Sequence, residues 1–188
     1  MKPLLTSTSL ALLCAAALPA HADPALVPAQ SEIAFTSKQM GVPVDGKFRS
    51  FTAQVAFDPR KPETAKIGFA VDLTSATLGV PETDAELGKP EWFNTKAFPQ
   101  ATFQSSSVKA LGGGKFEVSG KLSIKAIGRD VVVPVALAQS GATTTASGSF
   151  AIKRLDYRIG EGDWKDTSMV ADPVQVRFKL VLTGVGPL

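Results

Sequence analysis

The chain contains one cysteine, one histidine and one tyrosine among its 188 residues. Cys14 and His21 both fall within residues 1–22, so residues 23–188 have neither a thiol nor an imidazole. This absence excludes disulfides, cysteine or histidine nucleophile–base pairs and the usual zinc ligand sets from that part of the chain. It also removes the side chain that most often acts as a general base near neutral pH. We therefore predict no catalytic residue, no bound metal and no cofactor.

The charged residues form no long run of one sign. The formal net charge is +3, from 20 Lys and Arg against 17 Asp and Glu, and no basic stripe is interleaved with aromatic residues. Proteins that bind nucleic acid usually carry such a stripe, so we expect no nucleic-acid partner. Residues 23–188 are enough for one hydrophobic core, and we predict a single domain over that range.

Residues 1–22 have the features of an export signal. A positively charged start precedes an apolar run at residues 10–18, and Ala20-His21-Ala22 offers the small-x-small pattern that a signal peptidase recognises. The apolar run is too short to be a permanent bilayer anchor. The prediction is cleavage after Ala22 and a periplasmic location.

Strict two-residue alternation dominates the rest of the sequence. Alternation of this kind places apolar side chains on one face of a β-strand and polar ones on the other. The longest apolar rows are Ile67, Phe69, Val71 and Leu73; Phe116, Val118, Leu122 and Ile124; Val131, Val133, Val135 and Leu137; and Val174, Val176, Phe178, Leu180 and Leu182. Shorter rows bring the total to about eight strands.

Short glycine-containing segments separate several of these strands. The predicted turns are Gly112-Gly113-Gly114, Ile127-Gly128-Arg129 and Ser140-Gly141-Ala142. Consecutive strands with such connections pair antiparallel. A change of phase within residues 44–57 predicts a bulge at Arg49-Ser50, because one extra residue moves every later side chain to the other face. The expected fold is all-β, an eight-stranded antiparallel barrel.

Two segments interrupt this meander. Residues 81–99 include a predicted helical turn at residues 83–88, with acidic residues near its start and a glycine at its end. Residues 155–171 contain Trp164 and Met169 and lack alternation. We expect both segments to fold over an end of the barrel.

The acidic residues form no recognisable site. Asp163, Asp166 and Asp172 lack the ligand spacing of a calcium loop. Asp72, Asp84 and Glu86 could supply a carboxylate pair for acid–base work, but nothing in the pattern brings them together. A solvated position is the better interpretation for each of them.

The eleven phenylalanines are the remaining candidates for a ligand-binding site. The interior of an eight-stranded barrel is just wide enough to be packed by side chains or to hold one ligand. Small residues at inward positions are expected to leave room beside the phenylalanines, so the pattern permits an apolar cavity as well as a solid core. These small residues are Gly46, Ala53, Ala101, Gly120, Ala146 and Gly148.

Several segments match a known family in order and spacing. They are residues 31–35, 44–51, 92–103, 120–135, 149–154 and 174–182, including Val44-Asp45-Gly46-Lys47-Phe48 and Gly120-Lys121-Leu122-Ser123-Ile124-Lys125. The sequence resembles the YceI-like family of exported, lipocalin-like barrels. The resemblance implies binding of a polyisoprenoid or an isoprenoid quinone. The family often has histidines where this chain has Gln30 and Gln39.

The leading hypothesis is a periplasmic carrier of a long apolar lipid. The candidate lining residues are Phe35, Phe48, Phe69, Phe103, Phe150 and Phe178, with Trp92 and Phe93 at the mouth. One alternative is a ligand-free, stress-related or interaction module that docks on a membrane redox protein. A second alternative is an enzyme acting on the bound lipid, for which Asp72 is the one candidate acid.

Overall fold

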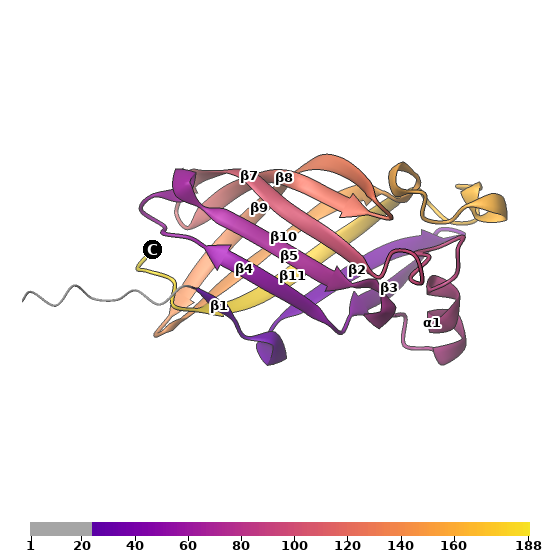
Figure 1. The fold of residues 1–188 in the computed structure, drawn as a ribbon, viewed down its shortest axis with the longest axis horizontal. Helices are drawn as coiled ribbons and strands as arrows, with labels where there is room; N and C mark the ends of the chain where they lie inside the picture. The colour runs from indigo at the N-terminus through magenta and orange to yellow at the C-terminus, as the bar shows by residue number, and fades with distance from the viewer. Residues whose placement is uncertain (1–23) are drawn as a thin grey trace, which may run out of the picture.

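The computed structural model describes residues 24–188, and the predicted export signal with Cys14 and His21 lies outside the described residues. The described chain forms one antiparallel sheet that curls into an elongated, lipocalin-like barrel (Figure 1). The predicted all-β, antiparallel fold is confirmed. The strand order is β4-β5-β7-β8-β9-β10-β11-β2-β3-β6, and β1 pairs with β11.

The elements follow one another along the chain with few long connections. The strands are β1 (Ala25–Leu26), β2 (Glu32–Gln39), β3 (Val42–Phe48), β4 (Phe51–Ala56), β5 (Lys66–Asp72), β6 (Ala76–Thr77), β7 (Gln100–Gly112), β8 (Lys115–Ile124), β9 (Ile127–Ser140), β10 (Thr143–Lys153) and β11 (Pro173–Thr183). The helices are α1 (Pro81–Leu87) and the 3₁₀ helices η1 (Pro28–Gln30), η2 (Pro62–Thr64), η3 (Leu73–Ser75), η4 (Arg154–Tyr157) and η5 (Gly162–Lys165). Within residues 24–188, none of the helices has the length and apolar character needed to cross a bilayer.

The predicted bulge at Arg49-Ser50 is wrong, because the strand breaks there. The Arg49 and Ser50 amides donate to the backbone oxygen (3.2 Å) and hydroxyl (3.0 Å) of Ser75, and the Asp72 amide donates to the Ser50 oxygen. The break separates β3, which pairs with β2, from β4, which pairs with β5. Residues 24–188 therefore contain nine strands of six or more residues, instead of about eight.

Two of the three predicted turns are confirmed, and the third lies elsewhere. Gly113-Gly114 and Gly141-Ala142 join their strands as expected. The turn between β8 and β9 is Lys125-Ala126, with φ of +50° and +60°, and Gly128 lies inside β9. Two-residue hairpin turns favour positive φ because this matches the strand twist, and a glycine or asparagine usually supplies it. Here Lys125 and Ala126 adopt positive φ although neither is glycine. The prediction relied on Gly128 and therefore placed the turn two residues too late.

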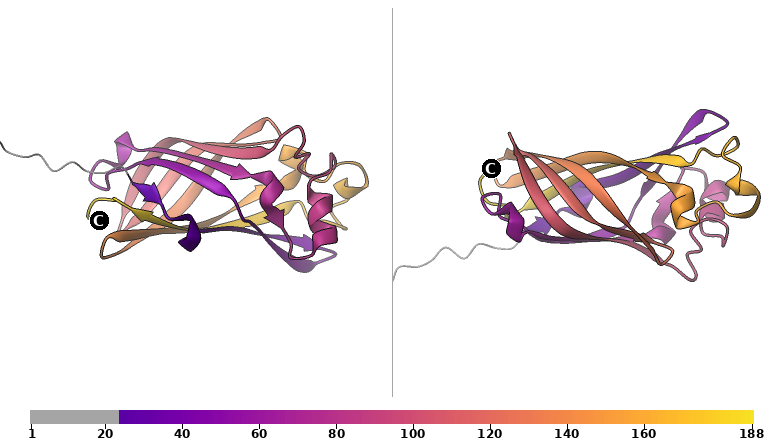
Figure 2. Two further views of the ribbon diagram at one scale, coloured as in Figure 1. Left: turned by 60° about the horizontal axis from the view of Figure 1, so that its bottom comes forward. Right: turned by 90° about the horizontal axis from the view of Figure 1, so that it is seen from above.

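Both interrupting segments gather at one end of the barrel, which we call the capped end (Figures 1 and 2). The predicted helical turn is confirmed as α1, which starts at Pro81 and is followed by Gly88. The amides of Gly160 and Glu161 both donate to the Glu91 oxygen at 2.8 Å, joining the two segments. The Met40 amide donates to the Met169 oxygen, which attaches the β2–β3 hairpin to the same end.

Candidate functional site

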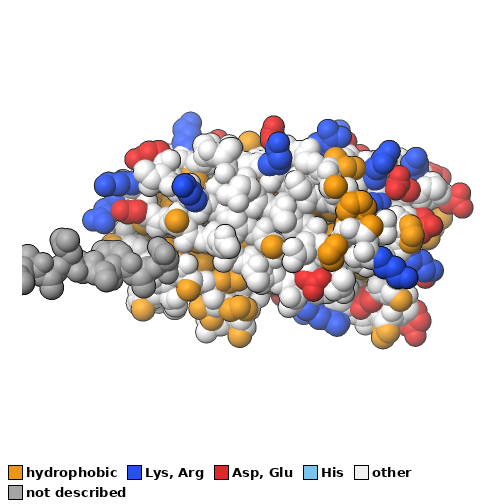
Figure 3. All heavy atoms as spheres, viewed as in Figure 1, with side chains coloured by type: hydrophobic (Ala, Val, Ile, Leu, Met, Phe, Trp, Pro, Cys, Tyr) orange, Lys and Arg blue, Asp and Glu red, His pale blue; other side chains and the backbone are white. Residues whose placement is uncertain are grey.

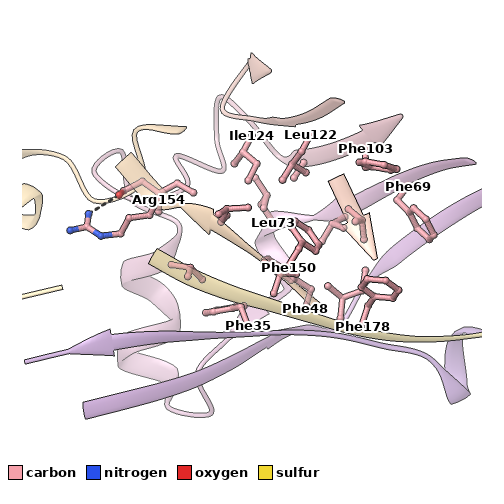
Figure 4. Close-up of a pocket in the computed structure, with 18 of the residues that line it drawn as sticks. Phe35, Phe48, Phe69, Leu73, Phe103, Leu122, Ile124, Phe150, Arg154 and Phe178 are labelled. Atoms are coloured by element: carbon pink, nitrogen blue, oxygen red, sulfur yellow. Dashed lines mark hydrogen bonds between the residues drawn. The ribbon is translucent and has the colours of Figure 1, made fainter. Parts of the chain in front are cut away.

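A cavity of about 340 Å³ occupies the barrel interior. Its wall consists of side chains from nearly every long strand, from α1 and from residues 154–170 (Figure 4). The apolar rows predicted from alternation supply most of this wall, and on β11 the whole row from Val174 to Leu182 faces inward. The strand period therefore places the apolar face of the sheet on the cavity.

The structure places all eight sequence-predicted candidates on this wall. They are Phe35, Phe48, Phe69, Phe103, Phe150 and Phe178, together with Trp92 and Phe93. Phe69, Phe103, Phe150 and Phe178 face the interior and yet are only partly buried. A side chain in a solid core is normally buried, because protein interiors pack as densely as organic crystals. The partial exposure of these rings therefore reflects open space inside the barrel.

Three of the phenylalanine rings lie over glycines of adjacent strands. The pairs are Phe35 with Gly46, Phe103 with Gly120 and Phe178 with Gly148. A β-carbon at Gly120 would be 2.5 Å from the Cζ atom of Phe103, so the ring occupies the space above that glycine. The expectation that glycines leave free room beside the rings is wrong at these positions. Instead, each ring lies along the wall, which keeps the barrel axis open.

Trp92 and Phe93 lie at the capped end of the barrel. The Trp92 ring is 5.3 Å from that of Trp164, and the Phe93 ring is 6.1 Å from that of Phe48. Phe93 is buried and belongs to the hydrophobic cluster at this end, whereas Trp92 is half-buried. Phe93 is thus part of the inner closure, and the two tryptophans lie closer to solvent.

Polar side chains enter the cavity wall only at the capped end of the described structure. Ser37 and Gln39 come from the end of β2, and Thr83 and Glu86 come from α1. The opposite end, which we call the far end, is lined by apolar groups such as Phe57, Phe116, Leu137 and Leu182. The cavity therefore has one polar and one apolar end.

Arg154 is a further polar wall residue, which the sequence pattern did not reveal as a site residue. Its guanidinium is buried and donates to five backbone oxygens (Figure 4 shows its place in the cavity wall). The acceptors are Ala171 (3.2 Å), Ile159 (2.8 Å), Gly160 (3.1 Å), Trp164 (2.6 Å) and Val170 (2.7 Å). A guanidinium has five N–H donors, so all of them are used. Strand alternation could have indicated this residue, because Arg154 follows Phe150 and Ile152 at two-residue spacing and so points inward as they do.

Burial affects the charge of Arg154 as well as its contacts. Desolvation lowers the pKa of its guanidinium, and the nearby Asp172 carboxylate acts in the opposite direction. Arginine nevertheless stays protonated in proteins because its intrinsic pKa is so high. The Asp172 carboxylate accepts from the Leu155 amide at 3.0 Å, which places it beside the start of η4.

Lys125 is a second buried cation at the capped end. Its Nζ donates to the backbone oxygens of Pro90 (3.1 Å) and Arg158 (2.7 Å) and to the Glu161 carboxylate (3.3 Å). It thereby joins the β8–β9 turn to both capping segments. The sequence did not predict a role for Lys125. The predicted turn was at residues 127–129, which would have placed Lys125 at the end of a strand instead of in the turn itself.

The acidic candidates serve as local anchors. Asp72 accepts from the amide (2.9 Å) and hydroxyl (2.6 Å) of Thr74 and does not line the cavity. Asp84 accepts from the Thr77 hydroxyl at 2.6 Å and from the Leu78 amide, and chiefly the Thr77 bond lowers the pKa of Asp84. Residues 24–188 contain no group of three or more His, Cys, Asp and Glu side chains placed to hold a metal ion.

A family model described as YceI-like domain matches residues 25–182. The chain belongs to the YceI-like family. Among solved structures, BcnA of Burkholderia cenocepacia is 45% identical with a TM-score of 0.81, over 83% of this chain and 98% of BcnA. A polyisoprenoid binding domain from Saccharophagus degradans is 17% identical with a TM-score of 0.70, over 85% of this chain and 97% of that domain. The latter likeness shows the fold alone.

Curated relatives match this YceI-like chain over a shorter stretch. The UPF0312 protein of Azotobacter vinelandii is 32% identical over 88 residues, which are 47% of this chain and 46% of that protein. Protein YceI of Escherichia coli O157:H7 is 30% identical over 96 residues, 51% of this chain and 50% of YceI. The matched part of the chain thus spans about half the length of these two relatives.

Proposed function

We propose that this protein is a periplasmic carrier that holds one long apolar lipid, of isoprenoid or quinone type, inside the barrel. The observation that carries the proposal is the continuous apolar cavity of about 340 Å³. Ligand cavities commonly measure roughly 300–1,000 Å³ and are lined by apolar and aromatic groups with a few polar ones. The shared fold with the polyisoprenoid binding domain of Saccharophagus degradans supports the same ligand class.

Burial of hydrocarbon is the proposed source of affinity. Each methylene group removed from water contributes about 0.8 kcal/mol, so several isoprene units offset the cost of ordering the lipid. The aromatic rings along the wall provide contact without blocking the axis. This mode of binding uses no metal or cofactor.

A pair of substitutions on β11 tests the proposal. Val176 faces the cavity and Gln175 faces solvent. The lipids in an organic extract of natively purified protein are identified by mass spectrometry for the wild type, Val176→Trp and Gln175→Trp. We expect a stoichiometric isoprenoid or quinone in the wild type and Gln175→Trp, and its loss in Val176→Trp because the indole fills the cavity.

Two results would contradict the proposal. A folded Val176→Trp protein that retains the lipid would place the ligand elsewhere. No lipid in any of the three proteins would favour the ligand-free interaction module. The location is tested separately, by sequencing the periplasmic form, which we expect to begin at Asp23.

A further inference from the structure

The polar end of the cavity has a chemistry that distinguishes between possible head groups. Building on the proposed function, we infer that it accepts an uncharged polar head, such as a hydroxyl, a phenol or a quinone carbonyl, and disfavours a phosphorylated one. The isoprenoid tail then extends toward the apolar far end. The capped end offers neutral hydrogen-bonding side chains to a ligand, whereas its buried cations already donate to backbone oxygens.

Neutral hydrogen-bonding groups and one carboxylate line this end. Ser37 and Thr83 provide hydroxyls and Gln39 provides an amide, which together offer donors and acceptors to an uncharged oxygen. Glu86 is the only acidic residue among those that line the cavity in the described part of the chain. Its side chain is 49% exposed, and its Oε1 atom is 2.6 Å from Lys89 Nζ. A phosphate at the same place would meet a like charge.

The buried cations nearby have no donor to offer a phosphate. Arg154 is the only basic residue on the cavity wall within residues 24–188, and its five N–H groups already donate to backbone oxygens. Lys125 does not line the cavity, and its Nζ donates to three acceptors of the capping segments. Phosphate recognition depends on charge-assisted hydrogen bonds from free basic groups. Neither residue supplies one unless its own contacts break.

The exposed basic residues do not form an alternative phosphate site. Lys38 lies between Ser37 and Gln39 on β2, so strand alternation directs it to the outer face. Lys89 is paired with Glu86, and Arg158 Nε is 3.9 Å from Glu161. On the face of the capped end that is visible in Figure 3, acidic and basic side chains are interspersed and form no basic patch. The charge on this face therefore provides no net attraction for an anion.

The test compares ligands with the same tail and different heads. Delipidated wild-type protein is titrated with geranylgeraniol and with geranylgeranyl monophosphate at neutral pH, following the fluorescence of Trp92 and Trp164. We expect the alcohol to bind at least about tenfold more tightly, since the phosphate carries about −1.5 to −2 charges and finds no free cation. Equal affinity, or tighter binding of the phosphate, would overturn the inference and leave the carrier proposal standing. Binding of neither ligand would overturn both.

A matched pair of α1 variants locates the discrimination. Glu86→Gln removes the wall carboxylate, and Glu82→Gln removes a carboxylate of the same helix that does not line the cavity. We expect Glu86→Gln to reduce the alcohol-to-phosphate affinity ratio several-fold, and Glu82→Gln to leave the ratio at its wild-type value. The same change in both variants would show that only the general charge of the helix matters, and would overturn the role of Glu86.

Hydrogen bonding at the polar end is tested with a ligand that has no head group. Thr83→Val keeps the shape of the side chain and removes its hydroxyl. We expect it to weaken binding of geranylgeraniol while affecting a hydrocarbon of similar length less. Equal losses for the two ligands would indicate a packing effect and count against a head group at this end.

Discussion

The two ends of the barrel are held together by different interactions. At the far end, Val108, Phe116, Val118 and Val133 form a buried cluster, and the ring of Phe57 packs edge-on against Phe116 with centroids 5.4 Å apart. At the capped end, apolar residues pack as well, but two buried cations join the loops through backbone oxygens. One end depends chiefly on side-chain packing, and the other also depends on buried hydrogen bonds.

The difference follows from how backbone groups are satisfied. Strands pair their own N–H and C=O groups, so packing of alternate side chains completes the far end. The loops at the capped end have no ladder, and their buried carbonyls need donors from elsewhere. Arg154 supplies five donors from one position, and Lys125 adds three more contacts. The end that presents polar groups to the cavity is therefore the end built from loops.

The largest expected effect is at Arg154. Arg154→Met leaves several buried carbonyls without donors, and we expect a loss of about 5 kcal/mol in the free energy of unfolding. Arg154→Lys retains some donors and should lose less. Lys153→Met, which changes an exposed neighbour, should lose little. Denaturant unfolding measures all three, and equal stability of the Arg154→Met and Lys153→Met proteins would show that the capped end does not depend on this network.

A pair of phenylalanine substitutions compares a buried ring of the cavity wall with a partly exposed one. Phe116 lines the far end of the cavity but is buried in the far-end cluster, so Phe116→Ala should cost about 3–5 kcal/mol even in the delipidated protein. Phe69→Ala should cost less in the delipidated protein, because its ring already borders open space. Its loss should increase when lipid is present, since bound ligand stabilises the native state and the variant binds it less tightly. A large Phe69 loss that lipid does not change would indicate a solid core.

Two glycine substitutions test the arrangement of rings on the wall. A β-carbon at Gly148 would meet the backbone oxygen of Pro134, whereas at Gly46 the nearest atoms belong to the side chains of Phe35 and Leu78. We expect Gly148→Ala to cost about 1–3 kcal/mol, and Gly46→Ala to cost less because its neighbours can turn into the cavity. Thermal unfolding compares the two. Gly46→Ala should instead weaken lipid binding, and unchanged binding would contradict the proposed ring placement.

The smallest effect concerns acid stability at the capped end. The hydrogen bonds to Asp84, with that from Thr77 first, keep the pKa of its carboxyl in the folded protein below its ordinary value. Its contribution to stability is therefore present above the unfolded pKa and is lost as pH falls through the folded pKa. Asp84→Asn should reduce the decline of stability below about pH 4 relative to the wild type. Glu82→Gln, on the same helix, is the control, and an identical decline in the wild type and Asp84→Asn would refute the prediction.

The alternation of the sequence by itself determined the strands, the inward rows and two of the glycine turns. The reason is that side-chain direction along a strand depends on local chain geometry, which has a period of two. This is also why the six candidate phenylalanines on strands lie on one wall, whereas Trp92 and Phe93 reach it from the segment after α1. The acid-rich turn with a final glycine likewise located α1, since helix ends have local signals.

Only the tertiary structure decided that the interior is a cavity, because this depends on the register of neighbouring strands. Phe178 and Phe35 are opposite Gly148 and Gly46 in their ladders, and that pairing lets each ring lie along the wall. The break at Arg49-Ser50 likewise depends on bonds to the distant Asp72–Ser75 stretch. The role of Arg154 requires five carbonyls brought together by folding, and no local pattern encodes them. Periodicity fixes which way a side chain points, but what it meets there depends on chain segments far apart in sequence.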